Sequence, residues 1–142
     1  MPAKRPFFLD TNIFVYSFST TDPGKRDRSR TLIAEAIETG QGIISSQVVQ
    51  EFLNAASRKF KTPLKPADCR RYLEAVLNPL CRVYPSIELY KEALAVMERW
   101  RFGFYDSLIV SAALASRCRI LYTEDLSDSQ EIRDLKIVNP FR

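Results

Sequence analysis

The sequence predicts an α/β fold in which a mainly parallel sheet of about five strands is covered by helices on both faces, in three layers. Short apolar segments alternate with helical segments of about ten or more residues, which is the pattern of a parallel sheet with right-handed crossovers. Hydrophobic residues make up 46% of the 142 positions, enough for a buried core. This length is typical of one compact unit, so we expect a single domain over residues 1–142.

Turn and cap residues separate the elements of the first half. Phe7–Leu9 is an apolar run too short for a helix, and the polar triplet Asp10–Asn12 follows it. Asp22 and Pro23 favour a helix start, because Pro is preferred at the first helical position, and Gly40 ends that helix. The elements expected here are a strand over 7–9, helices over 13–18 and 22–39, a strand over 42–44, a helix from 46 to about 56 that Ser45 or Ser46 can cap, and a helix over 66–78.

Prolines mark the elements of the second half in the same way. Pro79 is expected to end the preceding helix, and Pro85 with Ser86 opens the next one. The elements expected here are a strand over 81–84, a helix from 86 to about 100, an apolar helix over 105–116, and strands over 120–122 and 137–138.

The composition excludes several kinds of chemistry. The chain has no histidine, which removes Ser-His-Asp hydrolysis, Cys-His nucleophiles and His-ligated zinc. Its cysteines, Cys69, Cys81 and Cys118, are odd in number and widely spaced, so we expect core positions for them instead of a disulfide framework or zinc site. No Gly-rich phosphate loop is present, which disfavours nucleotide triphosphate hydrolysis.

The protein is expected to be located in the cytoplasm. Met1–Leu9 lacks the apolar stretch of a signal peptide, and no apolar run has the length of a membrane span.

Basic residues concentrate in one tract. Residues 57–71 carry a net charge of +5, whereas the rest of the chain carries −1. Within this tract the candidate RNA-binding residues are Arg58, Lys59, Lys61 and Lys65. Two interpretations remain open for it: a solvated helix face with a polar connector, or a track for nucleic acid phosphates.

Four acids lie where the ligand crevice of a parallel sheet is expected, beyond the carboxyl ends of strands. Asp10 follows the first strand, Glu51 lies in the second turn of the helix after the second strand, Asp106 opens the apolar helix, and Asp125 follows the strand over 120–122. Each also has a structural interpretation, because Asp10 and Asp106 can cap helices and Asp125 can be a turn residue. Glu51 is expected close to an apolar face, where a lone carboxylate is costly.

Convergence of these acids would require a cation, since four unpaired carboxylates repel one another. A site of oxygen ligands favours Mg²⁺ or Mn²⁺ over zinc. Such an ion activates a water for attack on a phosphate and neutralises charge in the transition state.

The acids belong to the segments Phe-Leu-Asp-Thr-Asn (8–12), Ser-Ser-Gln-Val-Val-Gln-Glu-Phe (45–52), Tyr-Asp-Ser-Leu-Ile-Val-Ser-Ala-Ala (105–113) and Leu-Tyr-Thr-Glu-Asp-Leu (121–126). In this order the chain resembles the PIN-domain nucleases, in particular the VapC-type toxins of toxin–antitoxin pairs. The ending Ile-Val-Asn-Pro-Phe (137–141) is similar to that of a subgroup of these toxins. The resemblance implies a PIN-like fold, a dimeric endoribonuclease and inhibition by a cognate antitoxin.

The same resemblance assigns roles to residues. It implies that the metal-binding and catalytic cluster consists of Asp10, Glu51, Asp106 and Asp125. It also implies that the polar groups around this cluster are Asn12, Ser107 and Thr123. Glu124 is an alternative to Asp125, because only one of two adjacent side chains in an extended segment points inward. The chain departs from similar sequences at Ser127–Ser129, where they often have Gly, so the resemblance does not assign the geometry of the loop after Asp125.

The leading hypothesis is therefore a Mg²⁺- or Mn²⁺-dependent endoribonuclease that uses water to produce 5′-phosphate and 3′-hydroxyl ends. A phosphoryl-transfer domain with an aspartyl-phosphate is one alternative, although its D-x-D pattern is replaced here by Asp10-Thr11-Asn12. A non-catalytic module that binds RNA or a protein partner is the other.

Overall fold

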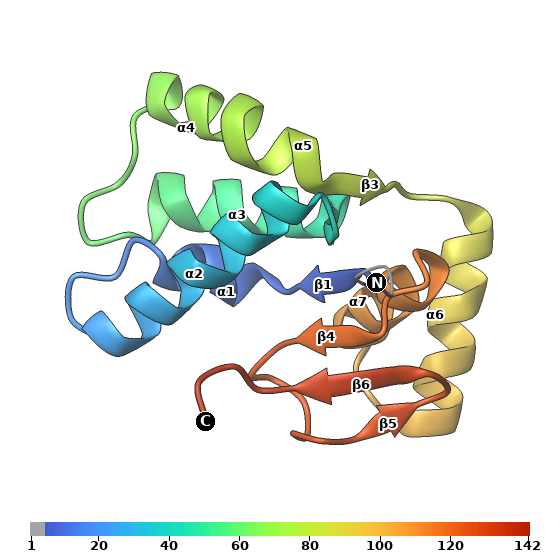
Figure 1. Ribbon diagram of the computed structural model, residues 1–142. Helices are drawn as coiled ribbons and strands as arrows, with labels where there is room; N and C mark the ends of the chain where they lie inside the picture. The colour runs from blue at the N-terminus through green and yellow to red at the C-terminus, as the bar shows by residue number, and fades with distance from the viewer. Residues whose placement is uncertain (1–4) are drawn as a thin grey trace.

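The computed structural model describes residues 5–142 and contains a six-stranded sheet (Figure 1). The strands are β1 (Phe7–Leu9), β2 (Gly42–Ser45), β3 (Cys81–Val83), β4 (Ile120–Tyr122), β5 (Glu131–Ile132) and β6 (Leu135–Val138). Their order is β3-β2-β1-β4-β6-β5, and all neighbours run parallel except β5 and β6. The predicted α/β class with a mainly parallel sheet is confirmed. Residues 1–4, part of the segment expected to lack a signal peptide, lie outside the described residues.

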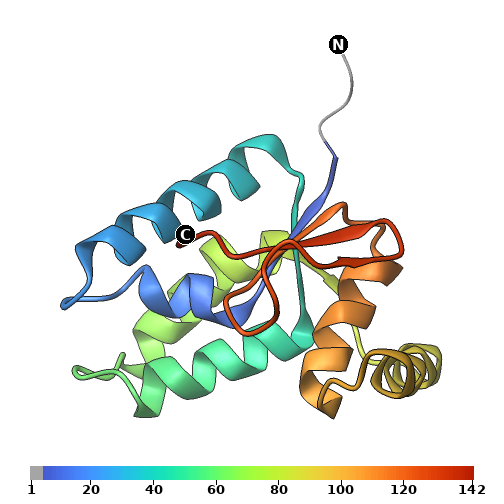
Figure 2. The same cartoon turned by 90° about the horizontal axis from the view of Figure 1, so that it is seen from below.

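Helices cover both faces of the sheet. They are α1 (Thr11–Tyr16), α2 (Pro23–Thr39), α3 (Ser46–Arg58), α4 (Pro66–Tyr72), the π-helical turn η1 (Leu73–Leu77), α5 (Asn78–Leu80), α6 (Ile87–Trp100) and α7 (Phe104–Ala115). Helix α2 packs on β2, whereas α7 packs against β2 and β4 and is itself covered by α6. Seen from below, α2 lies on one side of the sheet and the α6–α7 pair on the other (Figure 2).

Local sequence explains how α2 meets the sheet. Asp22 caps the helix by accepting a hydrogen bond from the Lys25 backbone N–H at 3.0 Å, and Gly40 ends it in the left-handed conformation with φ 68°. A Cβ at Gly42 would lie 2.1 Å from the Cβ of Ala36, so only glycine allows this approach of β2 to α2. The resulting core includes β1, whose three residues are all buried.

The structure corrects the strand count from about five to six. Leu135–Val138 is longer than the strand expected over 137–138, and it pairs with Glu131–Ile132 to form a hairpin. Two residues are too few for an alternating pattern, and the turn between the strands lacks the Asn-Gly or Asp-Gly pair that signals a hairpin. Arg133 instead adopts φ 55° in that turn, and its guanidinium forms an ion pair with Glu92 of α6 at 2.6 Å.

Pro79 does not end the helix that begins at Pro66. The chain passes through η1, which shifts the backbone hydrogen bonding from the α-helical pattern, and then continues as α5 with Pro79 inside it. Proline has no N–H to contribute to a regular α-helix, so the change of pattern before it accommodates the ring.

The three cysteines take the core positions expected for them: Cys118 is buried, and Cys69 and Cys81 are partly buried against the core. None of the helices between residues 5 and 142 combines the length and apolar character needed to cross a bilayer.

Candidate active site

The register of the sheet brings together residues that are far apart in sequence. Leu9 of β1 pairs with Tyr122 of β4, and the Asp10 backbone N–H donates to the Tyr122 carbonyl at 3.1 Å. Asp10 and Thr123 therefore leave the carboxyl ends of neighbouring parallel strands side by side. Helix α3 follows the adjacent strand β2 on the other side of β1.

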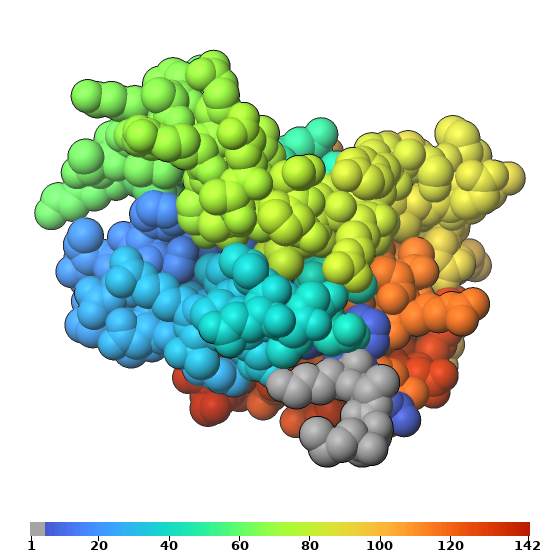
Figure 3. Space-filling view, turned by 45° about the horizontal axis from the view of Figure 1, so that its top comes forward, coloured from blue at the N-terminus to red at the C-terminus, as the bar shows by residue number. Residues whose placement is uncertain are grey.

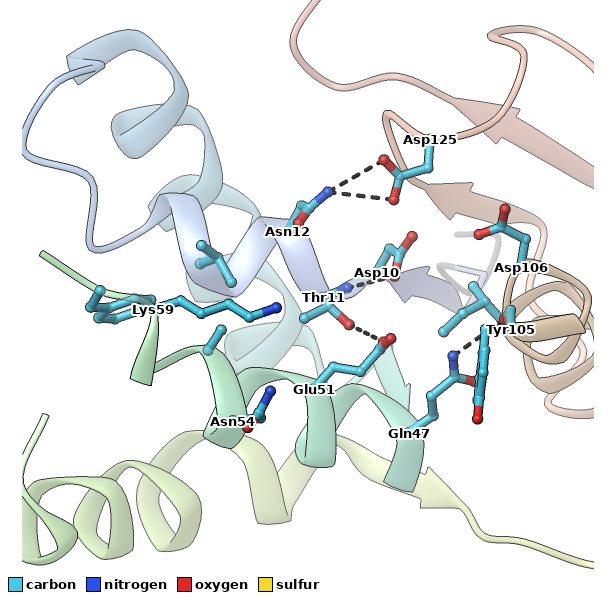
Figure 4. A pocket seen from close by; sticks show the side chains of 14 residues that line it. Asp10, Thr11, Asn12, Gln47, Glu51, Asn54, Lys59, Tyr105, Asp106 and Asp125 are labelled. Carbon is cyan, nitrogen blue, oxygen red and sulfur yellow. Dashed lines mark hydrogen bonds between the residues drawn. The ribbon is translucent and has the colours of Figure 1, made fainter. Parts of the chain in front are cut away.

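A cavity of about 450 Å³ lies at this edge (Figure 4). All four predicted carboxylates line it: Asp10, Glu51, Asp106 and Asp125. They come from the position directly after β1, from α3, from α7 and from the segment after β4, respectively. The fold thus gathers around one cavity the acids that the sequence places in four separate segments.

Asp10 is the most buried of these acids, with 7% of its surface exposed. It is the N-cap of α1, since its Oδ1 accepts from the Thr11 backbone N–H at 2.7 Å. Its Oδ2 accepts from the Thr123 hydroxyl at 2.8 Å. Burial raises the pKa of Asp10 to about 6; these hydrogen bonds oppose the rise, and the charges of Asp125 and Glu51 add to it. Asp10 is both a helix cap and a carboxylate that is costly to ionise.

The two adjacent acids after β4 take different directions. Asp125 lines the cavity, and its oxygens lie 3.4 and 3.5 Å from Asn12 Nδ2. Glu124 forms an ion pair with Lys25 Nζ at 3.2 Å and accepts from the Tyr16 hydroxyl, so it faces α1 and α2. Partial burial raises the pKa of Asp125, and the charges of Asp106, Glu124 and Glu51 raise it further. Of the two alternatives, Asp125 is the side chain that the structure places in the cavity.

The loop after Asp125 keeps its shape without glycine. Ser129 adopts the left-handed conformation with φ 68°, and its backbone N–H donates to the Ile137 carbonyl at 2.8 Å. A serine there carries a modest strain that a glycine would avoid. The Asp125 N–H also donates to the Thr123 hydroxyl at 3.1 Å, which connects this loop to Asp10.

Two expectations about the other acids are wrong. Glu51 is exposed instead of lying against an apolar face, because it lies on the cavity side of α3, where the Thr11 hydroxyl donates to it at 2.7 Å. Asp106 does not cap α7: the helix begins at Phe104 with Gly103 as N-cap, so Asp106 lies inside the first turn. A carboxylate in a first turn is favoured by the helix dipole.

The predicted polar neighbours do not all reach the cavity. Thr123 contacts Asp10, and Asn12 lines the cavity beside Asp125. Ser107 is buried and does not line the cavity, and its hydroxyl has no hydrogen-bond partner among residues 5–142.

Other lining residues were not expected from the sequence. Gln47, Asn54 and Tyr105 all line the cavity. Gln47 and Asn54 lie one turn before and one turn after Glu51 on α3, so helical spacing from Glu51 was the signal that could have found them.

The basic candidates divide into two groups. Lys59 lines the acidic cavity, and Lys61 lines a second cavity of about 590 Å³ that shares Val15 and Phe60 with the first. Arg58 and Lys65 are exposed but line neither cavity. In the space-filling view the green segment that contains them lies on the surface at one end of the molecule (Figure 3).

The donor set fits a hard divalent cation. Every acidic group at the cavity is a carboxylate. Burial raises the pKa of Asp10 and Asp125, the neighbouring carboxylates raise it further, and a bound cation would offset that charge. Within the described part of the chain, no three acidic or cysteine side chains already stand close enough to hold one ion. Binding would therefore require side-chain movement, for which the exposed Glu51 and Asp125 have room.

Comparisons with known proteins bear on the family and the fold. The PIN domain family model matches residues 7–130, and no curated protein matches the sequence significantly. A toxin–antitoxin complex from Klebsiella pneumoniae is similar in structure, with TM-score 0.66, 20% identity and coverage of 94% of this chain and 96% of that chain. VapC20 of Mycobacterium tuberculosis, described as a sarcin-ricin loop cleaving toxin, is similar with TM-score 0.63 and 16% identity. The match covers 84% of this chain and 89% of that chain. VapBC2 from Rickettsia felis, bound to a promoter DNA fragment, is similar with TM-score 0.58 and 25% identity. The match covers 92% of this chain and 96% of that chain.

Proposed function

The chain belongs to the PIN domain family, and from this membership we propose that it is a single-domain, metal-dependent endoribonuclease, the toxin of a toxin–antitoxin pair. The observation that carries the proposal is the convergence of Asp10, Glu51, Asp106 and Asp125 on one cavity at the carboxyl edge of the sheet. Toxin–antitoxin proteins among the structural neighbours support the biological role.

We propose Mg²⁺ or Mn²⁺ as the cofactor, held by these four carboxylates. When bound, the cation lowers the pKa of a water and neutralises charge on the phosphate. Thr11 and Thr123 fix the orientation of the Asp10 carboxylate through its two oxygens. Asn12 orients Asp125, and Lys59 supplies a positive charge at the cavity for the RNA backbone.

The other two hypotheses have less support from the site. Both oxygens of Asp10 are engaged in hydrogen bonds and its side chain is buried, which does not suit a nucleophile that forms an aspartyl-phosphate. A non-catalytic module has no need to gather four carboxylates at one cavity, where burial and neighbouring charges raise the pKa of Asp10 and Asp125.

The nature of the RNA ends tests the mechanism. Incubation of single-stranded RNA with the protein and Mn²⁺ is expected to give 5′-phosphate and 3′-hydroxyl ends, because an activated water attacks the phosphorus and the 3′ oxygen leaves. Mass spectrometry of the fragments measures this, with EDTA as the control. Cyclic 2′,3′-phosphate ends would contradict the water mechanism, since they arise when the ribose 2′-hydroxyl attacks.

Lys59 and Lys61 are expected to contact RNA phosphates, since they line two cavities that share Val15 and Phe60. Replacing both by Gln should flatten the slope of log K against log salt by about 1.4, because each contact with single-stranded backbone contributes about 0.7. Fluorescence anisotropy over a salt series measures the slope. Lys91→Gln with Lys136→Gln is the matched control, since both lysines are exposed and line neither cavity.

An unchanged slope in the Lys59 and Lys61 double variant would favour the other interpretation, a solvated surface. Adding Lys65→Gln or Arg58→Gln to that variant shows whether the contact extends outward along the basic tract.

Protein partners complete the proposal. We propose a cognate antitoxin as the inhibitor, consistent with the antitoxin complexes among the structural neighbours, and action in the cytoplasm, where RNA is present. The expected homodimer stays a prediction. Exposed apolar side chains on α6, Ile87, Tyr90 and Leu94, are candidate contacts for it.

A further inference from the structure

Tyr105 places an aromatic ring on the edge of the acidic cavity. It directly precedes Asp106 at the start of α7, lines the cavity, and is 68% exposed. Its ring touches only one aromatic neighbour among the described residues, Phe104, edge to face at 5.4 Å. A tyrosine ring in water loses the stabilisation of apolar contact, so an exposed one beside a polar cavity is available to a ligand.

Gln47 lies beside Tyr105 and supplies a second, independent observation. Its side chain is 8% exposed, and its Nε2 donates to the Tyr105 carbonyl at 3.2 Å. A carbonyl only accepts, so this contact fixes which end of the amide is the nitrogen. The remaining atom, Oε1, is buried without a hydrogen-bond partner in the described residues. A buried acceptor of this kind leaves a hydrogen bond available to a donor from outside the chain.

The two residues lie at one end of a path formed by two adjoining cavities. In Figure 4 Tyr105 and Gln47 lie at the side of the cavity opposite Lys59, with Glu51 and Asp10 between the two sides. Beyond Lys59, Phe60 and Val15 belong to both cavities, and the second cavity leads to Lys61. The path thus has an aromatic end, an acidic centre and a basic end.

We propose that Tyr105 and Gln47 bind one nucleobase of single-stranded RNA, next to the phosphate that is cleaved. The base stacks on the Tyr105 ring, and one of its N–H groups donates to Gln47 Oε1. The backbone then crosses the carboxylates toward Lys59 and Lys61. This inference rests on the proposed function, because it assigns the substrate to the same site, and stacking tolerates any base since each has a π face.

Binding of two RNA probes tests the subsite without cleavage. Both are short labelled oligomers, one an oligoadenylate and the other the same ribose-phosphate backbone with abasic residues throughout. In an Asp10→Asn background, Tyr105→Ala should weaken oligoadenylate binding by about 5- to 100-fold, the usual effect of losing one stacked base. Tyr105→Phe should retain the affinity, and the affinity for the abasic oligomer should not change in either variant.

Gln47→Leu tests the hydrogen bond separately. It should weaken oligoadenylate binding about fivefold and leave the abasic oligomer unaffected. Tyr84→Ala is the matched control, because Tyr84 is 60% exposed and does not line the acidic cavity, and it should bind both probes like the parent.

Two outcomes overturn the subsite. Tyr105→Ala could bind oligoadenylate like the parent, which would leave the exposed ring as a contact for a protein partner, or it could weaken both probes equally. Failure of the proposed function is recognised elsewhere, since the unsubstituted protein would then leave RNA uncut in Mg²⁺ and in Mn²⁺ whatever the result at Tyr105.

Discussion

Replacing Asp10 by Asn is expected to lower the rate of RNA cleavage by about 10³-fold. The substitution removes the negative charge at the centre of the cavity, and a metal supplies several kcal/mol of transition-state stabilisation, each 1.36 kcal/mol of which is tenfold in rate. The shape of the side chain is preserved, so the contact with the Thr11 N–H can remain. Cleavage of a labelled RNA in saturating Mn²⁺ measures the rate.

A second aspartate gives a matched control for this loss. Asp22 also caps a helix through a backbone N–H, in this case α2, but it does not line the acidic cavity. Asp22→Asn is expected to cleave at the parental rate, because Asn and Asp are comparable at an N-cap. Equal activity of Asp10→Asn and the parent would remove Asp10 from the active site and with it the centre of the proposed mechanism.

More of the acidic residues of the site could be predicted from the sequence than of the residues around them. Asp10 and Asp125 could be placed because each directly follows a short apolar strand, and parallel strands end at one edge of a sheet. The choice between Asp125 and Glu124 needed the structure. It depends on Lys25 and Tyr16, which hold Glu124 from helices about a hundred positions away in sequence.

Features without a periodic or turn signal were missed for physical reasons. Arg133 takes a left-handed turn that favours Asn or Gly, and an ion pair with Glu92 accompanies it there, so the hairpin has no local signature. Helix α7 begins at Phe104, two residues before Asp106, which places Tyr105 inside its first turn as well. Because Phe104 and Tyr105 read as part of an apolar run, nothing in the sequence showed that one ring is exposed.

Asp10→Asn, which is expected to remove activity, is also expected to stabilise the metal-free protein. Burial raises the pKa of Asp10 from 3.8 to about 6, so at pH 7 the folded state ionises this group at a cost that the unfolded state does not pay. This difference in pKa corresponds to about 3 kcal/mol. Asp10→Asn should therefore melt roughly 10 °C above the parent in EDTA at pH 7. Asp22→Asn, whose carboxylate caps a helix but lies outside the cavity, should not gain stability.

The stability gained by Asp10→Asn is expected to depend on pH, and the raised pKa of Asp10 sets the direction of that dependence. A carboxyl with a raised folded-state pKa contributes its stability fully below about pH 4 and loses it as the pH rises through about 6. The advantage of Asp10→Asn in EDTA should thus be small at pH 4 and complete by pH 7. Mg²⁺ or Mn²⁺ should then reduce the difference in stability between Asp10→Asn and the parent at pH 7. An ion bound only by the folded parent adds about 2.7 kcal/mol to the free energy of unfolding of the parent at a hundredfold excess over Kd. Differential scanning calorimetry at both pH values, with and without metal, measures each step. A variant that melts below the parent in EDTA at pH 7, with the same response to metal, would make Asp10 a helix cap alone.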